Sequence, residues 1–362
     1  MCLSPQAEIG YTGIRGRKLA FGNPNLDLDQ LPTKYLAKGD ALYNEIPNPF
    51  KGIINDGGPL SGDTIYAYQM LRPFPQFQEM QATRSLPGAR SQYDALNLKY
   101  AYSFNNGLAS ITTYRWSKML DNGSEALLGW AIGGQWRDFY NTKLDYGIST
   151  HDLPSSFAEV WLYQLPYGTG RRWGATAPRF VRETVGGWNV SGAVRLSSGY
   201  PLPNPVVLSG NNPLGGFGFP GPPLPDLVGN PKPKHRDMNH WINPDAFQGL
   251  SSSGNGSVVS CGKDPNCQPF PFRYGNEPQH MGNLREAGTK NLDLGIGKEF
   301  HMERVTAEFR GDFLNVFNHP IYGGSWGNIM NQTGDWAWAP FGSVNGTRND
   351  PRNIQVALKL VF

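Results

Sequence analysis

The sequence predicts an all-β protein, a partial antiparallel transmembrane β-barrel of about eight strands with long extracellular loops. Apolar residues recur with a period of two along several segments, and short turns alternate with long loops. Aromatic residues make up 12% of the chain, although hydrophobic residues reach only 39% and charged residues 17%. Short apolar strands joined by polar, turn-rich loops would give this mixture.

Composition excludes several other classes of protein. The aromatic content excludes simple disorder, and a net charge of +3 is too small to indicate a nucleic-acid partner. No apolar run reaches the roughly 18 residues of a transmembrane helix. Residues 1–5 lack the charged and apolar regions of a secretion signal. A barrel needs such a signal, so we expect the chain to be an N-terminally truncated part of a longer protein.

The first part of the chain predicts three strands. A weak strand covers residues 7–14. In residues 94–104, leucine, tyrosine and phenylalanine alternate with asparagine, lysine, alanine and serine. The Asn-Asn-Gly sequence at 105–107 is a tight-turn signal, and residues 108–118 complete the hairpin.

The middle of the chain predicts two more strands. Residues 188–197 alternate clearly, with Trp188 and every second residue after it on one face. Residues 157–165 form a weaker strand, because Glu159 shares the phase of the aromatic residues. The assignment of its two faces therefore stays open.

The C-terminal part predicts a hairpin at residues 291–316 and a final strand at residues 353–362. One face of the final strand is entirely apolar, while the other carries Gln355 and Lys359. The apolar face consists of Ile354, Val356, Leu358, Leu360 and Phe362.

Connection lengths predict which end of the strands lies outside. The long connections are residues 15–93, 120–154, 199–289 and 318–351, and short ones lie between them. Outer-membrane barrels have short periplasmic turns and long outer loops. A soluble β-sandwich also alternates, but its loops are usually compact. In the barrel, we expect these charged side chains to face the lumen: Lys99, Arg195, Glu308, Arg310, Asp312 and Lys359.

Short sequences in order along nearly the whole chain resemble the C-terminal β-barrel of TonB-dependent outer-membrane transporters of the Oar-like family. They include Leu-Pro-Tyr-Gly at 165–168, Gly-Gly-Trp-Asn-Val-Ser-Gly at 186–192 and Phe-Leu-Asn-Val-Phe-Asn-His-Pro at 313–320. Further matches lie at residues 8–13, 31–36, 71–77, 114–118, 198–201, 241–247 and 291–294.

The resemblance implies a 22-stranded barrel that is filled by an N-terminal plug and energised by the TonB system. It covers residues 1–362 as the C-terminal segment of that barrel, with the plug and N-terminal domain absent. It also implies that the final strand, ending in Phe362, is the signal read by the barrel-assembly machinery.

Catalytic and metal-binding patterns are weak. Cys261 and Cys267 bracket a Gly-Lys-Asp-Pro-Asn stretch, which favours a small disulfide loop over free thiols. His235, Asp237 and His240 lie in a polar loop and are expected to be solvated rather than to bind a metal. No nucleophile or zinc-protease motif is present. We therefore expect no enzyme activity, no metal and no cofactor.

These observations lead to a functional prediction. The chain is expected to be the barrel part of a nutrient transporter in the bacterial outer membrane. Its partners would be outer-membrane lipid, the assembly machinery, the plug, the TonB system and an unknown ligand. Ligand contacts are expected from residues 199–289, especially the glycine- and phenylalanine-rich run 215–219. The alternatives are a non-transporting surface barrel for adhesion or ligand binding, and a soluble secreted β-sandwich.

Overall fold

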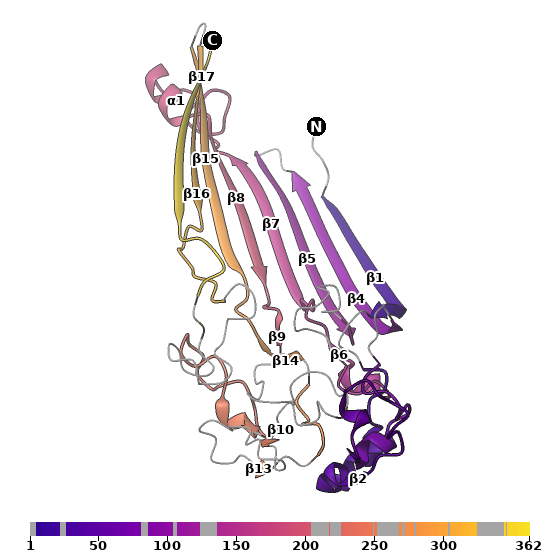
Figure 1. Cartoon of the computed structure of the whole chain (residues 1–362). Coiled ribbons are helices and arrows are strands. Elements are labelled where there is room, and N and C mark those ends of the chain that lie inside the picture. Colours follow the sequence, from indigo (N-terminus) through magenta and orange to yellow (C-terminus); the bar gives the residue numbers. More distant parts are fainter. Residues whose placement is uncertain are drawn as a thin grey trace.

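The main architectural feature is one antiparallel sheet with a curved face and a loop assembly at one end (Figure 1). Its long strands follow each other in the order β1-β4-β5-β7-β8-β15-β16-β17, and β6 pairs with β5. The computed structural model describes residues 5–21, 27–80, 86–103, 107–123, 136–203, 217, 226–248, 250–251, 268–269, 272–278, 280–302, 305–323, 344 and 346–362.

The eight long strands occupy the segments whose residues alternate in the sequence. They range from 9 residues in β17 to 18 in β4, enough to cross a membrane that needs roughly 9–11 residues per strand. Their bounds are β1 (Gln6–Phe21), β4 (Leu86–Ser103), β5 (Leu108–Asp121), β7 (Ser155–Gln164), β8 (Trp188–Ser197), β15 (Lys290–Met302), β16 (Val305–Leu314) and β17 (Asn353–Val361).

The remaining elements are short. Four pairs of strands, β2–β3, β9–β14, β10–β11 and β12–β13, form small separate sheets. The short strands are β2 (Glu45–Pro47), β3 (Thr64–Tyr66), β6 (Gly147–Ile148), β9 (Pro201–Pro203), β10 (Asp226–Leu227), β11 (Phe247–Gln248), β12 (Leu250–Ser251), β13 (Gln268–Pro269) and β14 (His280–Arg285). The helices are α1 (Arg179–Val185) and the 3₁₀ segments η1 (Thr33–Tyr43), η2 (Pro59–Ser61), η3 (Ala67–Leu71), η5 (Thr142–Asp145) and η7 (Pro244–Ala246). Among the described helices, none is long and apolar enough to cross a membrane.

The predicted alternation of short and long connections is confirmed. The end of the sheet that carries α1 also holds the start of β1 and the end of β17, while the long connections gather at the opposite end (Figure 1). The helix α1 lies inside the connection between β7 and β8, one of the connections that the sequence predicted to be short. This geometry is that of a β-barrel wall, with short turns on one side of the membrane and long loops on the other.

The strand register joins apolar residues into rows across the sheet. One row runs from Leu98 through Tyr114 and Phe157 to Leu196. Another runs from Ile296 through Gly311 to Val356. Because directly opposite residues share a face of a sheet, these rows make one face of the sheet predominantly apolar.

The register also resolves the position of Glu159. Its neighbours are Thr112 on β5 and Val194 on β8, so Glu159 lies on the apolar face. The Ser110 hydroxyl donates to Glu159 Oε1 over 2.9 Å. Lys298 lies on the same face and is 2% exposed, and its Nζ donates to the Glu183 and Thr184 carbonyls at the end of α1. Each of these ionisable groups on an apolar surface therefore has a polar partner.

The strands β1 and β4 extend beyond their predicted bounds. They pair through Arg15–Gln92 and Gly16–Ser91 and on to Phe21–Leu86, after a register shift beyond Gly16. Polar residues, glycine and proline interrupt the alternation there, so the period-two pattern misses this extension. Backbone pairing with the partner strand maintains the extended conformation.

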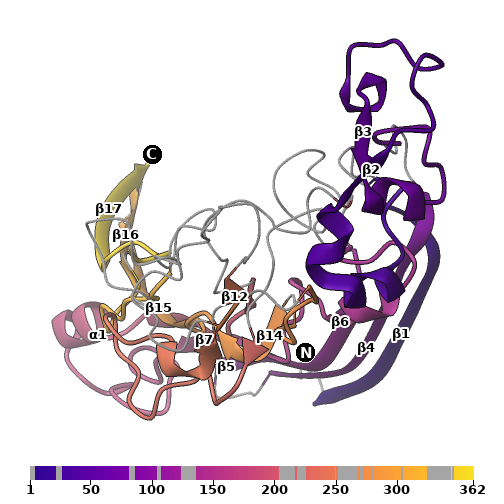
Figure 2. The same ribbon diagram turned by 60° about the horizontal axis from the view of Figure 1, so that its bottom comes forward.

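The sheet forms an open arc (Figure 2). The pairing path ends at β1 on one side and at β17 on the other, and these two strands do not pair with each other. No second large sheet packs on this one in the described part of the chain. The β-sandwich alternative is therefore wrong, because a sandwich requires two packed sheets.

The register generates a stability prediction at Gly192, whose cross-strand neighbour is Trp161. A Cβ added at Gly192 would lie 2.4 Å from the Trp161 ring. Gly192→Val should lower the free energy of unfolding by about 1–3 kcal/mol, because it overpacks this site. Urea unfolding of the detergent-solubilised protein, followed by tryptophan fluorescence, measures the change.

The matched control is Gly10→Val on β1, where an added Cβ meets nothing within 4 Å. That variant should unfold at nearly the wild-type urea concentration. Equal losses in the two variants would contradict the proposed packing of Trp161 on Gly192.

Candidate functional site

The six charged side chains predicted to face the lumen all lie on the face of the sheet opposite the apolar rows. The register places Lys99 and Arg195 in one cross-strand row, through Thr113 and Ala158. Each of the six has an ion-pair partner. The pairs are Lys99–Glu8 at 3.1 Å, Arg195–Asp293 at 3.0 Å, Arg310–Asp312 at 2.8 Å and Lys359–Glu308 at 3.3 Å.

These ion pairs are mostly exposed, so each adds little stability. Their arrangement matters more than their strength. They line a polar wall with alternating charges that water can solvate, as the inside of a water-filled barrel requires.

The apolar side chains of the predicted assembly segment are exposed on the edge strand β17 and the residue that follows it. Ile354, Val356, Leu358 and Leu360 are 54%, 67%, 67% and 49% exposed, and Phe362 is 91% exposed. In water, so continuous an apolar strip would be unfavourable. Hydrocarbon contact removes this penalty.

The described part of the loop assembly contains two small apolar cores. One contains Leu31, Leu36, Leu42 and Phe217, and the other is built around Leu202, Trp241, Met281 and Leu284. Phe217 is 0% exposed, and its ring packs on Tyr43 at 5.1 Å and on Tyr68 at 5.0 Å. The expectation that the run around Phe217 contacts ligand is wrong for this residue, because it forms the core that holds the loops together.

Buried ion pairs connect the loops to the strand ends. Arg285 of β14 donates to Asp152 Oδ2 at 2.6 Å and to the carbonyls of Asp152 and Gly199. Asp152 in turn accepts from the Met119 amide of β5 at 2.6 Å. The Asp152 side chain is 1% exposed. This one pair therefore joins the connection that follows β5 to the connection that follows β8 at the mouth of the sheet.

A second buried group organises the first long loop. Asp27 Oδ1 accepts from the amides of Asp29 and Met80 at 2.9 Å, and Asp29 Oδ1 accepts from the Phe74 amide at 2.7 Å. Arg72 Nη1 lies 3.5 Å from Asp27 Oδ2. Backbone amides and one guanidinium thus compensate two carboxylates that burial would otherwise penalise.

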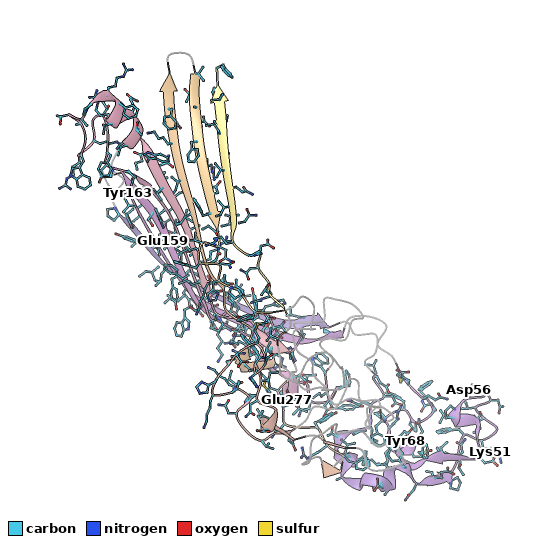
Figure 3. All side chains as sticks on the ribbon, turned by 90° about the vertical axis from the view of Figure 1, so that its left-hand side faces the viewer. Lys51, Asp56, Tyr68, Glu159, Tyr163 and Glu277 are labelled. Carbon is cyan, nitrogen blue, oxygen red and sulfur yellow. The ribbon has the colours of Figure 1, made fainter. Side chains whose placement is uncertain are left out.

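A cavity of about 210 Å³ opens in the same loop, beside the short strands β2 and β3 and away from the long strands of the main sheet. Figure 3 labels Tyr68, one of its lining residues, near the far end of the loop assembly. Tyr66 and Tyr68 are stacked, with ring centroids 5.8 Å apart, and Thr64 donates to Glu45 Oε2 over 2.9 Å. The other lining residues are Pro59, Leu60, Ile65 and Gln69. The cavity combines aromatic and aliphatic surface with a carboxylate.

The remaining sequence candidates are dispersed or outside the described residues. Cys261 and Cys267 lie outside them. His240 Nδ1 contacts Asp237 Oδ1 at 3.0 Å, and this bond lowers the pKa of the exposed Asp237 carboxyl. Across the described ranges, no group of three or more histidine, cysteine, aspartate and glutamate side chains is arranged to hold a metal ion.

The fold and its two faces define a transmembrane β-barrel protein: long antiparallel strands with one apolar face and one ion-paired polar face. The family model for an outer membrane beta barrel domain matches residues 5–355. The chain belongs to that family. The comparison with curated proteins and the comparison with solved structures gave no match.

The buried Arg285–Asp152 pair generates a second prediction. Arg285→Met should lower the opening free energy of the loops at residues 149–154 and 280–285 by about 3–5 kcal/mol, because it leaves the Asp152 carboxylate buried without its cation. Hydrogen exchange of the amides in these segments measures it.

The control is Arg195→Met, which removes an arginine whose side chain is 64% exposed from its pair with Asp293. That variant should lose at most about 1 kcal/mol. A loss for Arg285→Met as small as that for Arg195→Met would show that the buried pair does not hold the loops.

Proposed function

We propose that this outer-membrane β-barrel protein is the C-terminal barrel part of a TonB-dependent, Oar-like transporter that takes up a nutrient. The observation that carries the proposal is the open arc of the sheet. Two unpaired edges, at β1 and β17, are incompatible with hydrocarbon unless further strands pair with them. Such strands would complete a barrel with more than eight strands, as the resemblance to the Oar-like family requires.

The polar face supports the same proposal. A barrel that closed with only eight strands would fill its interior with side chains. The ion pairs from Lys99–Glu8 to Lys359–Glu308 instead spread charge over a broad, gently curved wall. We infer that this wall faces a wide lumen and that a plug domain packs against it. In this proposal the protein has no enzyme activity.

The cavity at Tyr66 and Tyr68 supports ligand capture by the outer loops. It lies in the loop assembly, on the side of the membrane from which a nutrient would arrive in the proposed orientation. This feature also fits the second candidate function, a surface barrel that binds a ligand without transporting it.

Genomic sequence in frame with the codon of Met1 separates the two candidates. Transport predicts an upstream segment that encodes a secretion signal, a plug and further strands. A secretion signal joined directly to the first strand would instead support the non-transporting barrel and refute TonB-dependent uptake.

The exposed C-terminal side chain generates a third prediction. Phe362 is 91% exposed, so its replacement removes little packing within the protein. Phe362→Asp should abolish insertion into the outer membrane, because it places a charge at the end of the apolar strip that we propose the assembly machinery reads. Membrane fractionation and heat-modifiable migration in gels report the outcome.

The matched control is Phe317→Asp, at a 75% exposed phenylalanine that follows β16 at the loop end of the sheet. It should assemble normally. Normal assembly of Phe362→Asp would refute the assembly role of the terminal residue.

A further inference from the structure

Glu277 is a buried carboxyl group at the junction between the strands and the loops (Figure 3). Its side chain is 0% exposed, and neither Oε1 nor Oε2 has a hydrogen-bond partner. Buried carboxyl groups without partners are rare, because the ionised form loses its hydration and gains nothing in return. The protein therefore maintains an unfavourable group at this position.

The segment around Glu277 connects separate loops. Arg137 Nη1 donates to the Glu277 carbonyl at 3.0 Å, and the Tyr274 hydroxyl donates to the Arg137 carbonyl at 2.5 Å. The Leu227 amide donates to Asn276 Oδ1 at 2.6 Å. Residues 272–278 thus tie the loop before β6 to β10 at the mouth of the sheet.

Arg137 does not neutralise the Glu277 carboxyl directly. Its Nε donates to Asp145 Oδ1 at 2.7 Å, and its Nη2 donates to the Leu144 carbonyl at 2.6 Å. Its Nη1 donates to backbone carbonyls. The guanidinium charge is therefore paired with Asp145, while Glu277 stays without a cation bonded to its side chain.

The other titratable and charged groups of the segments that these hydrogen bonds join have polar partners of their own. They are Arg137, Asp138, Asp145, Asp226, Arg273, Tyr274 and His280. Arg273 pairs with Asp226, and His280 Nδ1 contacts the Ile148 carbonyl at 3.0 Å. Thr33 donates to Asp138 Oδ2.

We propose that Glu277 is a proton-binding site that controls how residues 272–278 dock on the mouth of the barrel. With the proton bound, the neutral carboxyl fits its buried position and the loops stay joined. When the proton leaves, the carboxylate draws the segment toward water and releases Arg137 from the Gly275 and Glu277 carbonyls. Proton release thus loosens the loops that surround the proposed ligand path.

The direction of the pH dependence follows from linkage. Burial raises the pKa of Glu277 from 4.5 to about 9, and Arg137 opposes the shift only in part. The docked state therefore holds a proton that the undocked state releases above its ordinary pKa. The free energy that favours docking has its full value at a pH below the ordinary pKa of 4.5. It falls as the pH rises and levels off above the raised pKa of about 9. Within that window the undocked population rises about tenfold per pH unit.

Hydrogen exchange by mass spectrometry, on protein extracted from outer membranes in detergent, tests the proposal. The readout is the protection factor of peptides that contain residues 136–145 and 272–278. It is the intrinsic exchange rate at each pH divided by the observed rate. Between pH 6 and pH 8, wild-type protection should fall about 100-fold. Glu277→Gln should show no such fall, because the amide does not titrate.

Two further variants make the outcomes decisive. Glu183→Gln, at an exposed residue of α1, should keep the wild-type pH dependence. Glu277→Met is the second neutral variant, and its side chain has no polar atoms, so it covers the case in which residues 272–278 of Glu277→Gln do not dock. The protection of the same peptides in Glu277→Met should be independent of pH. Constant wild-type protection, an unchanged pH dependence in Glu277→Gln, or undocked loops at every pH in both Glu277 variants would overturn the proposal. None of these outcomes depends on whether the barrel serves TonB-dependent uptake.

Discussion

Backbone hydrogen bonding is the constraint on which the rest of this structure depends. In hydrocarbon every strand must pair with a neighbour on each side, so a membrane sheet has no tolerated edge. The eight long strands satisfy this requirement internally through a simple up-and-down order. The exceptions are the outer edges of β1 and β17. The same pairing sets the register, and the register decides which side chains share a face.

Two kinds of polar interaction follow from that register and act differently. On the sheet, exposed pairs such as Arg195–Asp293 keep a wall polar and hydrated while contributing little to stability. At the strand ends, buried groups such as Asp152 and Arg285 hold long loops that have only small apolar cores. Loss of one partner there is costly, because a buried charge remains. Glu277 differs from both, since its carboxyl has no partner in the docked loop.

Much of the sheet was predictable from alternation, whereas the loop site was not. Strands such as β8 and β17 have unbroken period-two patterns with one apolar face. The extension of β1 and β4 toward Phe21 and Leu86 lacks such a pattern and depends on pairing alone. Glu277 and Arg137 are far apart in sequence and belong to no motif. Phe217 showed a local signal, a glycine- and phenylalanine-rich run, that indicated a ligand contact but marks a buried core.

The sequence by itself determined the class of fold, the positions of the eight strands, the end that carries the long loops and the apolar and charged face of most strands. These features are local, because a period of two reflects the environment on either side of one strand. Only the tertiary structure decided the face of Glu159, the partners of Lys298 and the burial of Glu277. These depend on contacts between segments that are distant in the chain, and no local pattern encodes which buried polar groups will meet.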